Sequence, residues 1–335
     1  MIRPLALGFA LISTLAHAQV ARNIQVPGEL KISSDPVTAR AQLARMDVRY
    51  LWKLDGSDIA IRGEELFAND FLGNGHARSE GSAVSLKSCV RSGQRVDSFV
   101  LFERPAPDSP LSGYLKVEEK SLHSKLDKKS AFTIGGWFKQ YPTFIEDFRD
   151  INPGSLAPGF MPALVRFSKT TAHRPGMMEW MFHLTAERGY LNINRQYTGQ
   201  NDMNQQLPWW AHTFGTCYEN NQHSECWHYI SVAVDPAKNS VQFVIVRQAG
   251  WSYGDSGVTD YVSTGVTDAY LNNIDIPTSA QSVLHIGGNE NTGTHGIIRG
   301  LYFARKALTP VESKALSIYT APTKKGFNCG GRELR

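Results

Sequence analysis

The feature that most constrains this fold is a pair of alternating apolar runs joined by a short polar turn, "WHYISVAVDPAKNSVQFVIV" (227–246). In the first run Ile230, Val232 and Val234 occupy every second position, and the second run continues with the same period. A period of two is typical of β-strands, and Asp-Pro with a following Asn predicts the turn between them. Because both faces of the hairpin are apolar, we expect a sheet inside a sandwich, with Trp227 in its core.

Short alternating segments recur from Val48 onward, separated by clusters of Gly, Pro and Asn or Asp. Many short strands with almost no helical periodicity predict an all-β fold, an antiparallel jelly-roll β-sandwich with one short C-terminal helix. The helix is expected where Thr309 is a natural N-cap, Pro310 suits the first turn and Glu312 completes a capping box. The Ala- and Arg-rich segment 37–46 is a candidate for another short helix.

The first 18 residues have the organisation of a signal peptide. Arg3 supplies a positive charge, residues 4–16 form a short apolar core, and "AHA" (16–18) is a cleavage site of small residues. We therefore expect 1–18 to be removed and the mature chain to begin at Gln19, with a buried N-terminal helix as the alternative. No later apolar run is long enough to cross a membrane, which predicts a secreted, periplasmic or cell-surface protein without a membrane span after cleavage.

The 335 residues carry a formal net charge of +4, with Lys and Arg scattered along the chain. No basic run is interleaved with aromatic residues, so nucleic acid is not an expected partner. We expect an N-terminal spacer (19–46), one large domain (47–320) and a C-terminal tail (321–335).

Four cysteines in an exported chain indicate disulfides, and the sequence leaves three pairings open. Cys217 and Cys226 bracket a polar loop and make the simplest local bridge, which leaves Cys89 with Cys329. A metal site formed by Cys217, Cys226 and His228 is the alternative, but their spacing fits no common zinc pattern.

Four segments resemble, in order, the LamG-like, concanavalin A-like lectin/glucanase jelly-roll domains. They are "YLWKLDGS" to "FANDFLGNGHARSEG" (50–81), "SFVLFE" to "AFTIGGWFK" (98–139), the hairpin at 227–246, and "LHIGGNENTGTHGIIRGLYFARKALTPVESKAL" (284–316). The first resembles a strand that leads into an Asp…Gly-Asn-Gly loop, and the last resembles the closing strand and helix of the family. The resemblance implies a lectin-like jelly roll over roughly the whole predicted domain.

The resemblance also implies a structural Ca²⁺ at the "NDFLGNG" loop. Asp70 and the carbonyls of Gly73 and Asn74 are its candidate ligands, because calcium takes oxygen ligands. Arg299 and the residue after it stand where the family carries an Asp-Glu pair. The Arg299 guanidinium could therefore pair with Asp70 in place of the cation, and both arrangements stay open.

Catalytic patterns in the sequence are weak. A glucanase on this fold needs converging carboxylates, but the local pair Glu118-Glu119 would point to opposite faces of a strand. A lyase would use a His and a Tyr with Arg and amide groups. His183, Arg195, Tyr197 and Gln200 are near one another in the sequence, and a solvated strand face is the alternative. The "GDSG" segment (254–257) lacks the surroundings of a serine-protease triad and is typical of a plain turn.

The candidate ligand-binding residues are aromatic residues in polar loops. Trp209 and Trp210 follow a Pro in an amide-rich loop, and Trp251 and Tyr253 lie in a second loop. Flat rings stack on the C–H faces of sugars, whereas packing of these rings onto the sandwich is the alternative. We therefore predict a non-catalytic glycan-binding or surface-recognition protein whose partner is a glycan or a cell-surface protein. A polysaccharide hydrolase or lyase on the same fold, and a structural or adhesive component of a cell-surface assembly, are the alternatives.

Overall fold

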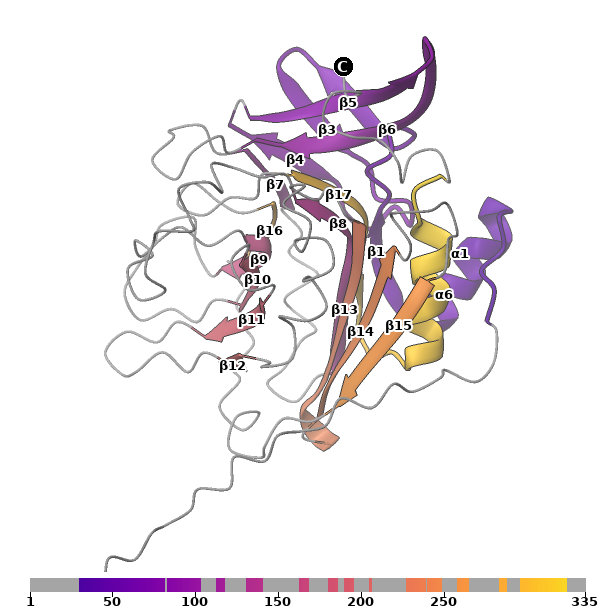
Figure 1. The fold of residues 1–335 in the computed structure, drawn as a ribbon, viewed down its shortest axis with the longest axis vertical. Coiled ribbons are helices and arrows are strands. Elements are labelled where there is room, and N and C mark those ends of the chain that lie inside the picture. The colour runs from indigo at the N-terminus through magenta and orange to yellow at the C-terminus, as the bar shows by residue number, and fades with distance from the viewer. Residues whose placement is uncertain are drawn as a thin grey trace, which may run out of the picture.

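The computed structural model describes residues 30–81, 83–103, 113–117, 131–140, 163–168, 180–185, 190–195, 205–206, 227–238, 240–248, 258–264, 283–287 and 296–323. Within these residues, the strands form two antiparallel sheets, A and B (Figure 1). Sheet A contains β1 (Val48–Trp52), β5 (Val84–Arg91), β6 (Gln94–Phe102), β8 (Phe132–Gln140), β13 (Trp227–Asp235), β14 (Ser240–Gln248), β15 (Val258–Thr264) and β17 (Gly296–Ala304). Sheet B contains β2 (Ile59–Arg62), β3 (Glu65–Ala68), β4 (Ala77–Glu80), β7 (Tyr114–Val117), β9 (Ala163–Ser168), β10 (Trp180–Thr185), β11 (Tyr190–Arg195), β12 (Gln205–Gln206) and β16 (Val283–Ile286).

The strand order shows which segments the fold brings together. Sheet A runs β15-β14-β13-β8-β17-β6-β5, and β1 also pairs with β17. Sheet B runs β12-β11-β10-β9-β16-β7-β4-β3-β2. Strands from both ends of the chain are therefore neighbours, and the described architecture confirms the predicted antiparallel β-sandwich with a short C-terminal helix.

The main hydrophobic core lies between the two sheets. Sheet A contributes buried side chains such as Phe102, Ile230 and Phe303, and sheet B contributes Leu115 and Ile286 among others. Strand residues alternate between the two faces of a sheet, so only every second side chain of each strand can enter this core.

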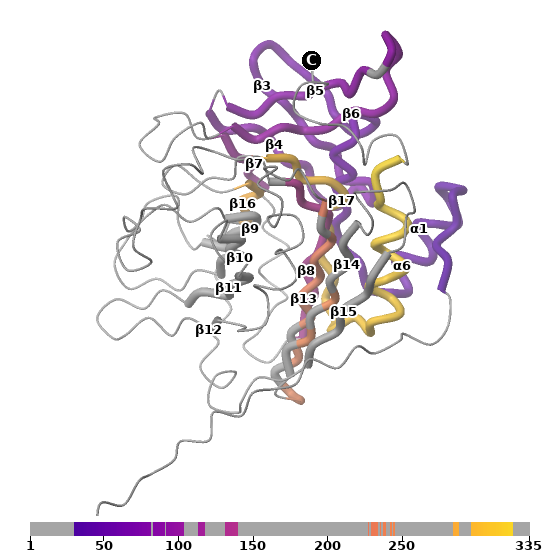
Figure 2. The backbone as a smooth tube through the Cα atoms, in the orientation of Figure 1, coloured from indigo at the N-terminus to yellow at the C-terminus, as the bar shows by residue number. Residues whose placement is uncertain are grey.

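A second core covers the outer face of sheet A, where α1 (Pro36–Arg45) and α6 (Pro310–Thr320) pack. It contains Leu43 of α1 and Leu316 of α6 together with Trp227 and Tyr229 of β13. α6 contacts β8 and β14, and Figure 2 shows α1 and α6 on the same side of β8 and β13. The two-sided burial of sheet A explains why both faces of the 227–246 hairpin are apolar, and Trp227 is fully buried as predicted.

Hydroxyl groups join α6 to sheet A. The Tyr229 hydroxyl donates to the Ser313 carbonyl at 2.7 Å and lies 2.8 Å from the Tyr302 hydroxyl. The Tyr302 hydroxyl in turn donates to Ser231 Oγ at 2.8 Å. Burial raises the pKa of Tyr302 to about 12, so this network stays protonated and holds the helix in register on the sheet.

The predicted capping box is present at α6, and the candidate short helix at 37–46 corresponds to α1. Thr309 and Glu312 form the capping box of α6, with hydrogen bonds in both directions. At α1 the Asp35 side chain accepts from the Thr38 N–H at 2.8 Å, and the helix begins at Pro36. Among the described residues, neither helix has the length and apolar character needed to span a membrane. The predicted signal peptide and most of the predicted tail lie outside the described residues, and the domain boundaries stay a prediction.

Candidate functional site

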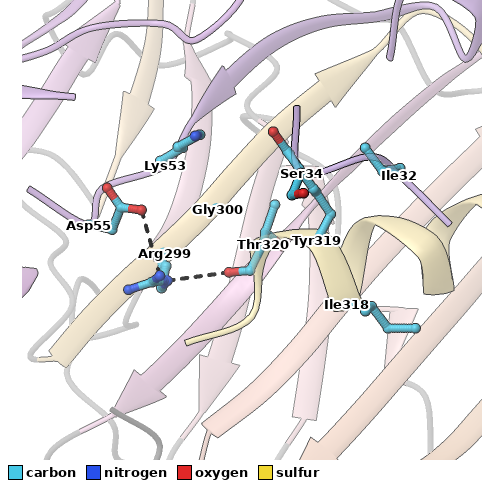
Figure 3. Close-up of a pocket in the computed structure, with 9 residues that line it drawn as sticks. All are labelled: Ile32, Ser34, Lys53, Asp55, Arg299, Gly300, Ile318, Tyr319 and Thr320. Atoms are coloured by element: carbon cyan, nitrogen blue, oxygen red, sulfur yellow. Dashed lines mark hydrogen bonds and ion pairs between the residues drawn. The ribbon is translucent and has the colours of Figure 1, made fainter. Parts of the chain in front are cut away.

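A pocket of about 360 Å³ opens beside the C-terminal end of α6. Four parts of the chain line it: the segment before α1, the turn after β1, the middle of β17 and the last turn of α6. Figure 3 shows Lys53, Asp55 and Arg299 along one side, opposite Ser34 and Tyr319. The lining residues are Ile32, Ser34, Lys53, Asp55, Arg299, Gly300, Ile318, Tyr319 and Thr320.

Gly300 brings these parts of the chain into contact. β1 pairs with β17, and the Gly300 N–H donates to the Lys53 carbonyl at 2.9 Å. Gly300 has a φ of +60°, in the left-handed region that favours glycine. A Cβ at this position would lie 2.3 Å from Thr320 Cβ, so the last turn of α6 can approach β17 only because the side chain is missing.

Arg299 forms a rigid wall of the pocket. Its guanidinium lies 2.8 Å from Asp97 Oδ1 and 3.6 Å from Asp55 Oδ2, and its Nε donates to the Thr320 carbonyl at 3.3 Å. The residue is only 7% exposed. Because buried charges are stable only when they are paired, the positive charge of Arg299 is already balanced within the protein.

Lys53 and Arg40 are cations held by aromatic rings. The Lys53 ammonium lies 4.3 Å from the centroid of the Phe71 ring and 6.0 Å from that of Tyr319. The Arg40 guanidinium lies 5.0 Å from the Phe71 centroid, and its Nε donates to the Phe71 carbonyl. Among the described residues, neither cation forms an ion pair with a carboxylate, and of the two only Lys53 lines the pocket.

Tyr319 supplies the aromatic surface of the pocket. Its ring lies 6.4 Å, centroid to centroid, from that of Phe71 and is half-buried. Burial raises the pKa of its hydroxyl, which the positive charge of Arg40 opposes and the negative charge of Asp55 reinforces. At neutral pH the hydroxyl is therefore a neutral hydrogen-bonding group.

The turn after β1 carries two acidic residues in different environments. One Asp55 oxygen accepts from the Ser57 N–H at 3.0 Å, and the other faces Arg299. Asp58 is buried, and its Oδ2 accepts from the Leu54 N–H at 3.1 Å, whereas Oδ1 has no hydrogen-bond partner among the described residues. Burial, with a smaller contribution from Asp55, raises the pKa of Asp58 to about 6 against the opposing hydrogen bond.

The predicted calcium loop is closed by its own backbone. Asp70 Oδ1 accepts N–H groups of Leu51 and Leu72, and Oδ2 accepts those of Asn74 and Gly75, at 2.7 to 3.3 Å. Both oxygens of the Asp70 carboxylate already accept hydrogen bonds from N–H groups, an arrangement that competes with the coordination of a Ca²⁺ ion. A calcium ion at this loop stays a prediction. No group of three His, Cys, Asp or Glu that could hold a metal ion occurs in the described part of the chain.

Gly73 and Asn74, the other two residues of the predicted calcium site, also make hydrogen bonds within the protein. The Gly73 N–H donates to the Asp70 carbonyl, and the Asn74 side-chain amide donates to the Arg49 carbonyl. The alternative arrangement, in which Arg299 pairs with Asp70, does not occur: Arg299 is ion-paired with Asp97 and Asp55.

The predicted aromatic and cysteine residues fall mostly outside the described residues. These are Trp209, Trp210, Trp251, Tyr253, Cys217, Cys226 and Cys329. Cys89 is buried in β5 and disulfide-bonded, but its partner is not among the described residues, so both pairings stay predictions.

Sequence reasoning missed the pocket beside α6. Lys53, Asp55, Arg299 and Gly300 lie in segments that resemble the LamG-like family, but no motif there marks a ligand site. The pocket forms only where β1 pairs with β17 and α6 folds back over them. The available signal was the Arg299-Gly300 pair, which departs from the pattern of the resembled family.

No protein-family model and no curated protein matches this chain. Among solved structures, it is similar to the binding domain of botulinum neurotoxin DC in complex with rat synaptotagmin II, at 10% sequence identity and a TM-score of 0.41. That similarity covers 83% of this chain and 52% of the other, so the chain spans about half the length of the neurotoxin structure.

Two arabinan-related structures are also similar. Domain 4 of AbnA, a GH43 extracellular arabinanase from Geobacillus stearothermophilus, in complex with arabinotriose, has 13% identity and a TM-score of 0.43 over 81% of this chain and 98% of that one. A GH54 α-L-arabinofuranosidase soaked with a cyclic sulfate inhibitor has 10% identity and a TM-score of 0.45 over 86% and 65%. These likenesses are distant, and the function of the chain therefore rests on its own residues.

Proposed function

We propose that this chain is an exported glycan-binding or surface-recognition protein of the LamG-like jelly-roll type, without catalytic activity. The observation that carries the proposal is the lining of the pocket beside α6, where the Tyr319 ring lies near a hydroxyl, a carboxylate and an ammonium group. A sugar offers a C–H face to an aromatic ring and hydroxyls that both donate and accept. The Tyr319 ring suits the C–H face of a sugar, and the polar groups of the pocket suit its hydroxyls.

Binding is favoured over hydrolysis by the state of the carboxylate in the pocket. A glycoside hydrolase needs an acid and a second carboxylate about 5 to 9.5 Å apart, both free to act on the glycosidic bond. Asp55, the carboxylate that lines the pocket, is held by Arg299 and Ser57. A polysaccharide hydrolase or lyase remains the alternative, and it predicts the release of reducing ends or unsaturated products.

The aromatic loops of the sequence are a second candidate surface. Trp209→Ala and Trp210→Ala should each weaken retention on a glycan column and leave the melting temperature within a few degrees. If both variants unfold instead, these rings belong to the core, and the pocket beside α6 is left as the binding site.

Export is part of the proposal. It predicts a mature chain that begins at Gln19 and contains a Cys217–Cys226 bridge, with Cys89 joined to Cys329. Intact mass and non-reduced peptide mapping of exported material test both, and free thiols at Cys217 and Cys226 would exclude the local bridge.

A glycan array with the mature chain tests the function. Saturable binding to a defined set of glycans supports the proposal. An array without any binding, together with capture of a cell-surface protein from its native assembly, would favour the structural or adhesive alternative.

A further inference from the structure

We infer that the pocket beside α6 binds the carboxylate of an acidic sugar, a uronate unit, with the Lys53 ammonium as its counter-ion. This inference rests on the proposed glycan-binding function and names the class of glycan. It assigns a ligand-binding role to Lys53 and Tyr319, which no sequence motif indicated.

The first step is the charge balance of the pocket. Arg299 is neutralised by Asp97 and Asp55, which it contacts at 2.8 and 3.6 Å. Lys53 and Arg40 have no such carboxylate among the described residues, and both lie over the ring of Phe71. Lys53 is therefore the lining cation that has no carboxylate partner among the described residues, and an anionic group in the pocket would supply that partner.

The N–H donors of Lys53 are available to a ligand. An ammonium has three N–H donors, and those of Lys53 make no hydrogen bond to the described residues. The ammonium instead lies over the faces of the Phe71 and Tyr319 rings, as a cation–π contact. Lys53 lines the pocket and is half-buried. A carboxylate in the pocket would complete the coordination of this cation with a charge-assisted hydrogen bond.

The third step separates a sugar acid from a simple anion. Asp55 also lines the pocket and would repel a compact dianion such as sulfate, but it accepts a hydrogen bond from a neutral hydroxyl. A uronate carries its charge at one end and neutral hydroxyls at the other. A volume of about 360 Å³ lies at the small end of the range of ligand pockets and fits about one sugar unit.

The test is an NMR titration of the mature chain with methyl glucuronide and with methyl glucoside, which differ only in the carboxylate. We expect the wild type to bind the glucuronide at least about tenfold more tightly, as one charge-assisted hydrogen bond allows. Lys53→Met should abolish that preference while it keeps the apolar stem over Phe71, and Lys53→Arg should restore part of it. Lys238→Met is the matched control, because Lys238 is 79% exposed and paired with Asp235 in the turn of the hairpin; it should leave the preference unchanged.

Each of the following outcomes would overturn the inference. Equal binding of the two glycosides by the wild type, or a glucuronide preference that persists in Lys53→Met, removes Lys53 as the counter-ion. Inorganic sulfate that binds as tightly as the glucuronide, and competes with it, shows a general anion site. If neutral glycans bind on the array and Lys53→Met has no effect, this inference fails and the proposed function stands. If no glycan binds on the array and the glucuronide titration is also silent, both fail.

Discussion

The guanidinium of Arg299 lies 2.8 Å from the carboxylate of Asp97, and this ion pair joins β17 to β6 across 202 positions of the sequence. Both side chains are nearly buried, with 9% and 6% of their surfaces exposed. Asp97 also accepts from the backbone and hydroxyl of Thr323, just after α6. One carboxylate thus connects the wall of the pocket to the end of the C-terminal helix.

Asp97→Asn should destabilise the fold strongly. The change leaves the buried Arg299 charge without its main partner, a loss of about 3 to 5 kcal/mol in the free energy of unfolding. Glu80→Gln is the control, because Glu80 is more exposed than Asp97, with 32% of its side chain accessible, and pairs with Arg78 and, at 3.9 Å, with Lys116. Pairs nearer the surface contribute about 0 to 1 kcal/mol. Chemical denaturation of both variants measures the difference, and equal losses would show that the Arg299 pair is not effectively buried.

Gly300→Ala should damage both stability and the pocket. Its added Cβ would meet Thr320 at 2.3 Å, in a backbone conformation with a φ of +60°. Gly63→Ala is a control with nearly the same φ, +62°, and no atom within 4 Å. We expect about 1 to 2 kcal/mol of destabilisation at Gly63 from the backbone alone, and about 1 to 3 kcal/mol more at Gly300 from the clash. Similar losses at the two sites would mean that α6 does not press on β17.

The pH dependence of stability should contain a contribution from Asp58. Its pKa is raised to about 6 in the folded protein, from an ordinary value of 3.8. Between these values the folded state binds more protons than the unfolded state, so the free energy of unfolding falls as the pH rises from about 4 to about 6. A shift of this size corresponds to about 3 kcal/mol.

Asp58→Asn should remove this part of the pH profile, because the amide is neutral throughout. Denaturation at a series of pH values measures it for the wild type and for Asp58→Asn. The exposed Glu64→Gln variant controls for the loss of one negative charge. A wild-type profile that is flat or rises between pH 4 and 6, with no difference from Asp58→Asn, would contradict the burial of Asp58.

Chelation should leave the melting temperature unchanged. The two Asp70 oxygens accept four backbone N–H groups, which hold the loop without a cation. Calorimetry with and without a calcium chelator, beside elemental analysis of the purified protein, measures this. Stoichiometric calcium together with a lower melting temperature after chelation would restore the calcium site that the family resemblance implies.

The local parts of the fold follow from sequence patterns. The alternation in 227–246 corresponds to β13 and β14, joined by the short 3₁₀ turn Pro236–Lys238. The Thr309–Glu312 capping box marks the start of α6, because a cap depends only on residues three positions apart. Period and capping are local properties, so a single sequence contains the information needed to predict them.

The pocket could not be predicted in this way, because its residues meet only through long-range pairing. Lys53 and Tyr319 are brought together by β1 on β17 and by α6 folding back over Gly300. One arrangement that the sequence left open paired Arg299 with Asp70, but Asp70 accepts hydrogen bonds from backbone N–H groups, three of them from its own loop. Arg299 instead pairs with Asp97 of β6 and with Asp55 in the turn after β1. The positions of these two residues depend on long-range pairing of the chain.

The measurement that tests the central claim most directly is calorimetric titration of the mature chain with an oligosaccharide selected on the glycan array, followed by mass spectrometry of the recovered sugar. The account predicts saturable binding, with a Kd nearer millimolar than nanomolar for a single site, and an oligosaccharide of unchanged mass. Cleavage products that have gained a water, or that carry an unsaturated end, would contradict it in favour of an enzyme, and an oligosaccharide that gives no saturable binding would contradict glycan recognition itself.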